Sequence, residues 1–316
     1  MKTLLAARAS SILYDVLLAR RGVGSFLLPA NICPIVPITF LKVGVPFEFV
    51  DISPATLHLD LDAARKRLAS KDAKYGGLLY VHTYGDPTTP NAVLSAIKAE
   101  HPDLLIIDDR CLCVPDLQAP PDCAADIVLY STGYAKIVDL GYGGYAFVDE
   151  SLDVQHCILP YEAKALELLE KRYKQATWAR QAYTYEDSNW LETESALPAW
   201  EDFSERVRTE LSASLEHRAD INAIYRSILP DAIFLPADYQ VWRYNIRVMD
   251  NRKILAAISA GGLFASGHYA SLTGVFGPGD APTATELGSQ VVNLFNDHHY
   301  TPEMAERTAH VILRSL

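Results

Sequence analysis

The segments LLIID (residues 104–108), DIVLY (126–130) and GYAFV (144–148) decide the fold class of this chain. Each is an apolar run of strand length, and short apolar runs between helical patterns are typical of buried strands. The other expected strands of the first half are residues 25–28, 46–50 and 76–81, and the expected helices are residues 10–20, 34–41, 61–69 and 90–100. This alternation predicts an α/β fold with a mostly parallel sheet, in which ligands bind beyond the carboxyl ends of the strands.

The second half of the chain has a different pattern. Long charged helical patterns cover residues 162–174 and 203–228, and the sequence between them, about residues 183–198, predicts a linker or flap. A strand at 241–248 and helices at 251–260 and 302–316 follow. We therefore expect a large α/β domain over residues 1–200 and a smaller α+β domain over residues 201–316.

Composition narrows the class of function. The chain has 316 residues, 49% of them hydrophobic and 21% charged, which is typical of a globular enzyme. The formal net charge of -11 argues against nucleic acid or an anionic membrane as the main partner. No run approaches the roughly 18 apolar residues that a membrane span needs. Five cysteines without a disulfide framework or metal-ligand spacing indicate a reducing, cytoplasmic setting and no metal.

A lysine with unusual neighbours indicates the chemistry. Lys136 ends the run STGYAK, which begins at Ser131, and a glycine-rich turn at residues 141–144 follows. Asp109 ends an upstream strand. This order is typical of a pyridoxal phosphate (PLP) site, where the lysine forms a Schiff base and the acid pairs with the pyridinium nitrogen. The alternatives are a solvated surface lysine and an aspartate that caps the following segment.

Other polar residues are weaker candidates for the same site. Ser131 could bind the cofactor phosphate, and so could Ser10 and Ser11, because a helix starts there and a helix N-terminus attracts anions. Serines at helix starts are also ordinary caps. His82, just after a strand, is expected to be a hydrogen-bonded core residue, and nothing at metal spacing accompanies His298.

Several segments resemble, in the same order, motifs of the DegT/DnrJ/StrS class of PLP-dependent sugar aminotransferases, which have fold type I. The resembling segments are residues 28–31 (LPAN), 49–57 (FVDISPATL), 81–85 (VHTYG), 107–109 (IDD), 131–136 and 141–144, with weaker matches at 266–269 (SGHY) and 293–295 (NLF). The resemblance spans most of the chain and is most specific in residues 28–148.

The resemblance implies a PLP-dependent transferase of fold type I, with a mostly parallel, seven-stranded type of sheet in the large domain. It implies transfer of an amino group, through a Schiff base of Lys136, to a keto group of a nucleotide sugar or related small metabolite. The freed lysine would move a proton as general base and acid. Glutamate is the expected donor, and the expected assembly is a homodimer.

Departures from the family pattern keep other functions open. Cys33 stands where an aromatic ring usually stacks on the cofactor, and Leu112 replaces a polar cofactor contact. The motif through which one subunit reaches the other's site has its nearest counterpart at residues 185–190. Ser10 stands close to the start, so we expect a divergent, N-terminally short member. The alternatives are a PLP enzyme of another reaction type, such as elimination or carbon–carbon bond chemistry, and a non-catalytic protein with the PLP fold.

Substrate-binding candidates lie in the second half. Arg243 and Arg247 alternate on a strand pattern and would share one face, where they could bind a donor carboxylate or a substrate phosphate. Arginines at such spacing are also common on solvated strands. His268 and Tyr269 could contact the substrate, although packing roles would fit them as well.

Overall fold

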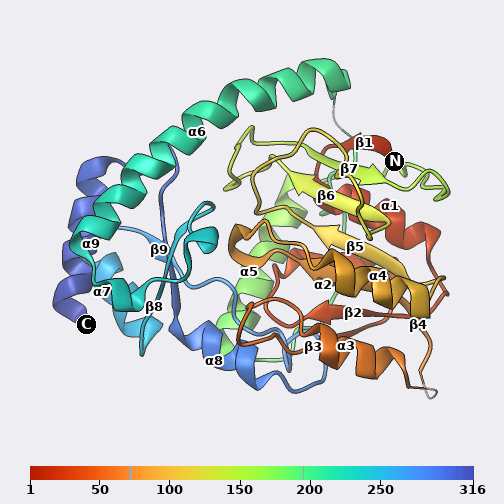
Figure 1. The fold of residues 1–316 in the computed structure, drawn as a ribbon, viewed down its shortest axis with the longest axis horizontal. Coiled ribbons are helices and arrows are strands. Elements are labelled where there is room, and N and C mark those ends of the chain that lie inside the picture. The colour runs from red at the N-terminus through yellow and green to blue at the C-terminus, as the bar shows by residue number, and fades with distance from the viewer. Residues whose placement is uncertain (71–72, 195) are drawn as a thin grey trace.

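The computed structural model describes residues 1–70, 73–194 and 196–316, and within them the first half of the chain builds one seven-stranded sheet (Figure 1). The strands are β1 (Lys2–Ala6), β2 (Ser25–Pro29), β3 (Phe47–Val50), β4 (Tyr75–Val81), β5 (Leu105–Asp109), β6 (Ile127–Ser131) and β7 (Gly144–Val148). Their order is β1-β7-β6-β5-β4-β2-β3. Strand β7 runs antiparallel to both of its neighbours, and the other pairs are parallel. The predicted mostly parallel α/β fold is confirmed.

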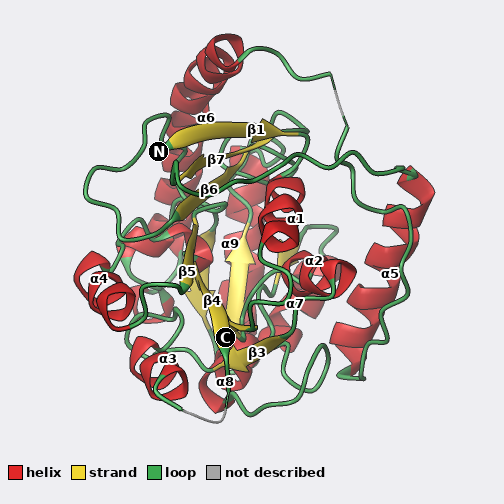
Figure 2. Ribbon diagram, turned by 90° about the vertical axis from the view of Figure 1, so that its right-hand side faces the viewer, coloured by secondary structure: helices red, strands yellow, loops and turns green. Residues whose placement is uncertain are grey.

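Helices cover both faces of this sheet (Figure 2). Those of the first half are α1 (Ala9–Ala19), α2 (Ile35–Val43), α3 (Leu61–Leu68), α4 (Asn91–Glu100) and α5 (Ala163–Ala179). The apolar faces of α1, α2 and α5 belong to one buried cluster, and those of α3 and α4 belong to a second cluster on the other face. Because both faces are covered, the inner strands are apolar on both sides, which is why they read as continuous apolar runs.

The second half forms a smaller sheet with its own helices. Its elements are α6 (Trp200–Ile228), β8 (Tyr244–Arg247), α7 (Asn251–Ala260), β9 (Ala265–Ser266), α8 (Pro282–Gln290), β10 (Val291–Leu294) and α9 (Pro302–Ser315). The strands pair in the order β8-β10-β9, all antiparallel. Helix α6 extends from the large sheet to the small one (Figure 1), since Phe203 packs in the large lobe and Tyr225 in the small lobe.

The chain returns to the large lobe after β9. Leu272, Phe276 and Leu287, all beyond residue 200, belong to the same buried cluster as α1 and α2. The two lobes are therefore visible, but they share part of their interior. The domain boundary at residue 200 stays a prediction.

Most predicted elements are present. The elements that the sequence did not predict are β1, β9, α8 and β10, which are short or are not separated from their neighbours by turn residues. Strand β1 is an edge strand that pairs only along β7 within the described residues. Helix α8 ends at Gln290 and β10 begins at Val291, so no turn residue separates the two patterns. The expected strand at 241–248 is limited to β8. The expected flap, 183–198, has neither helix nor strand where described, and residue 195 lies outside the described residues.

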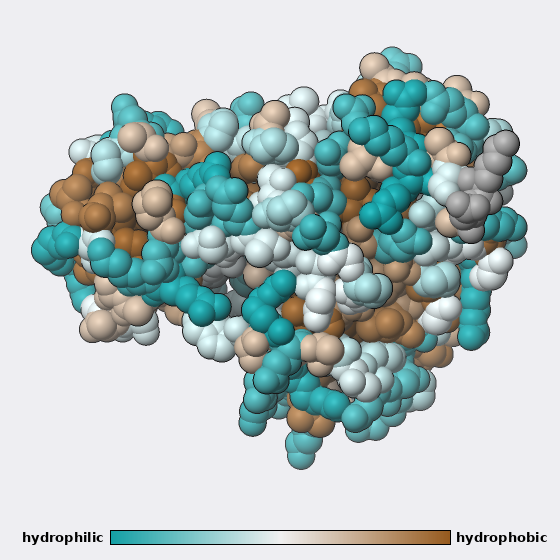
Figure 3. Space-filling view, turned by 90° about the horizontal axis from the view of Figure 1, so that it is seen from below, coloured by the Kyte–Doolittle hydropathy of each residue, from teal (hydrophilic) through white to brown (hydrophobic). Residues whose placement is uncertain are grey.

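No helix among the described residues is long and apolar enough to cross a membrane. On the face shown in Figure 3, hydrophilic and hydrophobic residues are interspersed.

Gly144 allows the start of α1 to approach the sheet. It opens β7 and is buried, and a Cβ placed there would lie 2.1 Å from the backbone nitrogen of Ala9. We expect Gly144→Ala to lower the free energy of unfolding by about 3 kcal/mol, because backbone atoms on both sides must shift. Urea unfolding measures this. The control is Gly261→Ala, because a Cβ at Gly261 would lie 3.3 Å from its nearest neighbour, the Ile258 carbonyl oxygen. Equal stability of the two variants would contradict this contact.

Candidate active site

Lys136 lies in the loop between β6 and β7, residues 132–143, which we call the lysine loop. The loop is closed by a hydrogen bond from the Leu140 backbone nitrogen to the Thr132 carbonyl, 2.9 Å. Ala135, just before the lysine, has a φ of 61°, and its N–H donates to the Asp139 carboxylate at 2.8 Å. Lys136 is half-buried. These bonds give the loop a defined shape around the lysine.

Asp109 and Ser131 end the adjacent parallel strands β5 and β6. Asp109 is 6% exposed, and its carboxylate accepts a hydrogen bond from the Cys111 backbone nitrogen at 2.9 Å. The Ser131 hydroxyl accepts one from the Gly133 nitrogen at 3.3 Å. The structure therefore brings both residues to the carboxyl edge of the sheet, beside the lysine loop.

Two half-buried thiols lie in the combined field of Asp109 and Lys136. Burial raises the pKa of Cys33, the Lys136 ammonium opposes that shift and Asp109 adds to it. Burial also raises the pKa of Cys111 well above its usual value, again with Asp109 reinforcing and Lys136 opposing. Both thiols are therefore close enough to Asp109 and Lys136 for the two charges to influence them. The assignment of Cys33 to the family's stacking position stays a prediction.

The N-terminus of α1 lies beside the lysine loop, because Arg8, just before the helix, donates to the Gly141 carbonyl of that loop. Ser10 is half-buried, whereas Ser11 is fully buried and its hydroxyl donates to the Glu192 carbonyl at 2.6 Å. Ser11 thus has a packing partner, and Ser10 is the more accessible of the two. Arg8, just before the helix, donates to the Glu192 carboxylate at 2.9 Å and to the Gly141 carbonyl at 2.9 Å.

Arg8 is a residue that sequence reasoning missed. Its guanidinium and the Ser131 hydroxyl both lie 3.5 Å from the point where a Cβ of Gly133 would stand. A cation, a hydroxyl and a helix N-terminus therefore converge. The signal available in the sequence was a basic residue directly before a predicted anion-binding helix start.

His268 and Tyr269 border the same region from the second half. The Tyr269 ring stacks on Trp242 with centroids 6.2 Å apart. His268 retains some solvent exposure as a residue, and desolvation by the surrounding protein lowers the pKa of its imidazole to about 4, with the cations Arg243 and Lys136 adding to that shift. His268 is therefore uncharged at neutral pH.

Arg243 is placed differently from the sequence expectation. It lies before β8, is 1% exposed and forms an ion pair with Asp297 at 2.9 Å. No hydrogen-bond partner for its Nε lies among the described residues. Arg247 is exposed and pairs with Glu286 at 3.2 Å. The expectation that the two arginines share one face is wrong, because β8 starts only at Tyr244 and Arg243 turns inward.

A buried polar network fixes the end of β5 beside Asp109. His82 contacts the Asp108 carboxylate through Nε2 and the Asp86 carbonyl through Nδ1, each at 2.6 Å, and Arg110 donates to Asp108 at 2.8 Å. Desolvation alone would raise the pKa of Asp108, but the bonds and charges of His82 and Arg110 outweigh it and lower that pKa. The His82 backbone nitrogen also donates to the Asp109 carbonyl at 3.0 Å. These hydrogen bonds hold the end of β5 in place, so the network has a structural role beside Asp109.

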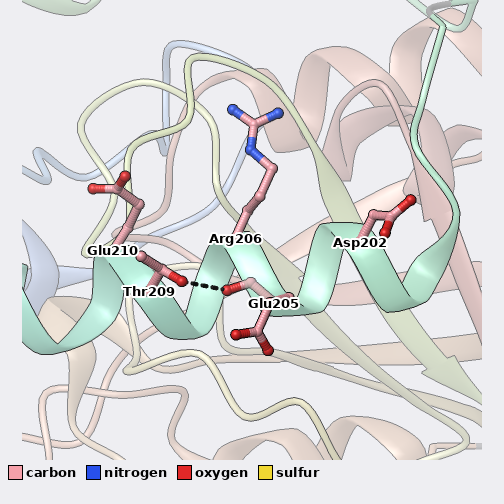
Figure 4. Close-up of a pocket in the computed structure, with 5 residues that line it drawn as sticks. All are labelled: Asp202, Glu205, Arg206, Thr209 and Glu210. Carbon is pink, nitrogen blue, oxygen red and sulfur yellow. Dashed lines mark hydrogen bonds between the residues drawn. The ribbon is translucent and has the colours of Figure 1, made fainter.

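Two hollows on the surface are not lined by Lys136, Asp109 or Ser131. One of about 330 Å³ is lined by residues of a single helix face on α6, where the Thr209 hydroxyl donates to the Glu205 carbonyl at 2.9 Å (Figure 4). A second of about 580 Å³ lies between α6 and the far side of the lysine loop and is lined by Asp139, Ser214 and His217, among others. Among the residues with defined placement, no group of His, Cys, Asp and Glu could hold a metal ion.

Comparison with known proteins identifies the fold. No protein-family model and no curated protein matches the sequence. The solved structures that match include a DegT DnrJ EryC1 StrS aminotransferase from Brucella abortus, with a TM-score of 0.68 and 17% identity over 99% of this chain and 86% of the other. Sugar aminotransferase CalS13 from Micromonospora echinospora has a TM-score of 0.68 and 18% identity, over 99% and 87% of the two chains. Helicobacter pylori PseC, an aminotransferase involved in the biosynthesis of pseudoaminic acid, has a TM-score of 0.69 and 15% identity, over 100% and 86%. Over nearly its full length, this chain has the fold of the DegT/DnrJ/EryC1/StrS aminotransferases.

Proposed function

We propose that this chain is a PLP-dependent aminotransferase of the DegT/DnrJ/StrS family. It would transfer an amino group, with glutamate as the donor, to a keto group of a nucleotide sugar or related small metabolite. The observation that carries the proposal is the placement of Asp109, Ser131 and Lys136 at one edge of the sheet in a chain with this fold. The named activities of the structural neighbours, a sugar aminotransferase among them, support the same class of reaction.

The residues at this edge fit PLP. The Asp109 carboxylate is nearly buried, as an acid that pairs with a pyridinium nitrogen must be to act strongly. The phosphate would lie at the N-terminus of α1, near Ser10, Ser131 and Arg8, and Ser11 would support that helix start from within. Cys33 would pack beside the ring. When bound, the cofactor supplies a ring that accepts the electrons released from the donor carbon.

The protein's own groups then have separate tasks. Lys136 would bind the cofactor covalently and later move the proton as general base and acid. His268, uncharged at neutral pH because its pKa is about 4, would contact the substrate without adding charge. Tyr269 would line the same side from its place on Trp242. Arg243 is buried, so it would support the substrate side of the site from inside the protein, where it is paired with Asp297.

Exposed apolar side chains support a homodimer. Ile158, Leu168 and Trp178 are 63%, 57% and 68% exposed, and they lie close in sequence on α5 and the segment before it. Large exposed apolar groups of this kind commonly mark protein contacts. The five cysteines are free, which fits a cytoplasmic location.

The proposal is tested with purified protein and added PLP. We expect an absorbance band of bound cofactor, a stable mass adduct on Lys136 after borohydride reduction, and loss of the band when glutamate is added. An adduct that responds to no amino donor would contradict aminotransfer and favour another PLP reaction, such as elimination or carbon–carbon bond chemistry. A protein that forms no adduct at saturating PLP would overturn the enzymatic proposal altogether.

A further inference from the structure

The backbone on both sides of the predicted catalytic lysine is held by side chains from the second half of the chain. The Trp242 indole Nε1 donates to the Ala135 carbonyl at 2.8 Å. The Arg218 guanidinium donates to the Lys136 carbonyl at 2.9 Å. Two consecutive carbonyls of the lysine loop therefore depend on residues that lie far away in sequence.

Arg218 is an unusual residue for this position. It is 2% exposed, on α6, and its other bonds reach the Trp242 carbonyl at 2.7 Å, the Asn296 side chain at 2.6 Å and the Ser214 hydroxyl at 3.1 Å. Burial lowers the pKa of Arg218 to about 10, and the nearby Arg243 adds to that shift. No ion pair joins it to a carboxylate within the described residues.

A buried guanidinium without a carboxylate partner contributes little favourable charge pairing, and burying it is costly. What it does provide is a rigid fork of several donors. Here that fork connects the carbonyls of Lys136 and Trp242 with the side chain of Asn296, which lie in the lysine loop, in the segment before β8 and in the segment after β10. Its geometry therefore serves to hold these three segments together.

The conformation of Ala135 makes these bonds consequential. A φ of 61° is unfavourable for an alanine, by about 1–2 kcal/mol. The peptide is kept there by Asp139 at its N–H and by Trp242 at its carbonyl. Since the direction in which Lys136 leaves the backbone depends on this turn, loosening either bond would let the amine move.

We propose that Arg218 and Trp242 are positioning residues for Lys136: by holding the Ala135 and Lys136 carbonyls, these two side chains from the second half of the chain set the orientation of the ε-amine relative to Asp109. This inference rests on the proposed function, because it assigns a task to the lysine of that site. It links the placement of α6 and of the segment before β8 to the reactivity of a residue in the large lobe.

The first test separates lysine orientation from cofactor affinity. Pyridoxamine 5′-phosphate carries an amine in place of the aldehyde and cannot bond to a lysine, whereas PLP can. In Trp242→Phe we expect formation of the borohydride-trapped Lys136 adduct with PLP to be about tenfold slower, the effect of one lost hydrogen bond. The Kd for pyridoxamine 5′-phosphate should change less than twofold. The matched control is Trp200→Phe, whose ring packs on Tyr145 with centroids 5.3 Å apart, in the buried cluster on the other face of the sheet, and which should change neither value.

The second test uses the protein without cofactor. Hydrogen exchange of the lysine-loop amides, followed by mass spectrometry of peptides covering residues 132–143, should be several-fold faster in Trp242→Phe and unchanged in Trp200→Phe. Arg218→Met should show a larger effect than Arg218→Lys, because lysine restores a donor. If the Arg218 variants do not fold, the Trp242 pair decides the question alone.

The outcomes are distinct. An equal fall in pyridoxamine phosphate affinity and adduct rate would show that Trp242 only packs against the site, and unchanged loop exchange would overturn the positioning role. If the unmodified protein forms no adduct with PLP, the proposed function fails. In that case the exchange measurement still shows whether the two residues hold the loop.

Discussion

Lys136→Ala should lower the rate of amine transfer from glutamate to bound cofactor by about 10⁴-fold or more. The ε-amine would act both as the covalent anchor and as the group that moves the proton, and general acid–base catalysis alone contributes up to about 10⁴-fold. The backbone bonds of the lysine loop go to carbonyls and to the Ala135 N–H, so truncation of the side chain leaves them in place. Rapid-mixing absorbance with excess glutamate measures the rate.

Two companion measurements make the Lys136 result specific. Lys171→Ala, at an exposed position on α5, is the matched control and should retain the full rate. Pyridoxamine 5′-phosphate should still bind to Lys136→Ala, because that compound forms no bond with lysine. A Lys136→Ala protein that still yields a reduced adduct elsewhere and transfers amine at the normal rate would refute the assignment.

Asp109→Asn should lower the same rate by roughly 10³-fold. Asparagine keeps the size of the side chain and an oxygen for the Cys111 nitrogen, so the fold around β5 should be maintained. It removes the negative charge that would face the pyridinium nitrogen. Two unit charges about 3 Å apart at an effective dielectric constant of 20 interact by roughly 5 kcal/mol, which is consistent with a loss of that order. The half-reaction with glutamate measures it.

The control for Asp109 is at the other end of the same strand. Asp103→Asn changes an exposed residue shortly before β5 and should leave the rate unchanged. If Asp109→Asn stays within tenfold of the unmodified protein, the carboxylate serves only to bind the Cys111 N–H. That outcome would favour the structural interpretation of this acid.

The sheet could be predicted from the sequence because its central strands are buried on both faces. The predicted strands at 104–108 and 126–130 cover β5 and β6 except for the last residue of each, Asp109 and Ser131. Parallel neighbours place their carboxyl ends at one edge, so the convergence of Asp109, Ser131 and the lysine loop followed from strand order. The short glycine-rich connection to β7 limited how far Lys136 could lie from that edge.

Contacts with the lysine loop could not be predicted in the same way. Trp242 and Arg218 donate to backbone carbonyls. Because every residue has a backbone carbonyl, the sequence does not show which of them accepts a hydrogen bond. Their positions depend on the path of α6 and on how β8 begins. Arg243 shows the same difficulty. Its spacing from Arg247 indicated a shared strand face, but its position before β8 and its ion pair with Asp297 depend on the tertiary structure.

The return of the chain to the large lobe after β9 restricts how this protein can be recombined with its structural relatives. A chimera joined at residue 200 would replace Leu272, Phe276 and Leu287, which pack inside the first lobe, together with the small sheet. Interior packing tolerates mismatched volumes poorly. Exchange of the last third alone would therefore disturb the scaffold that carries Lys136. Only exchange of the whole chain as one unit would avoid this disturbance.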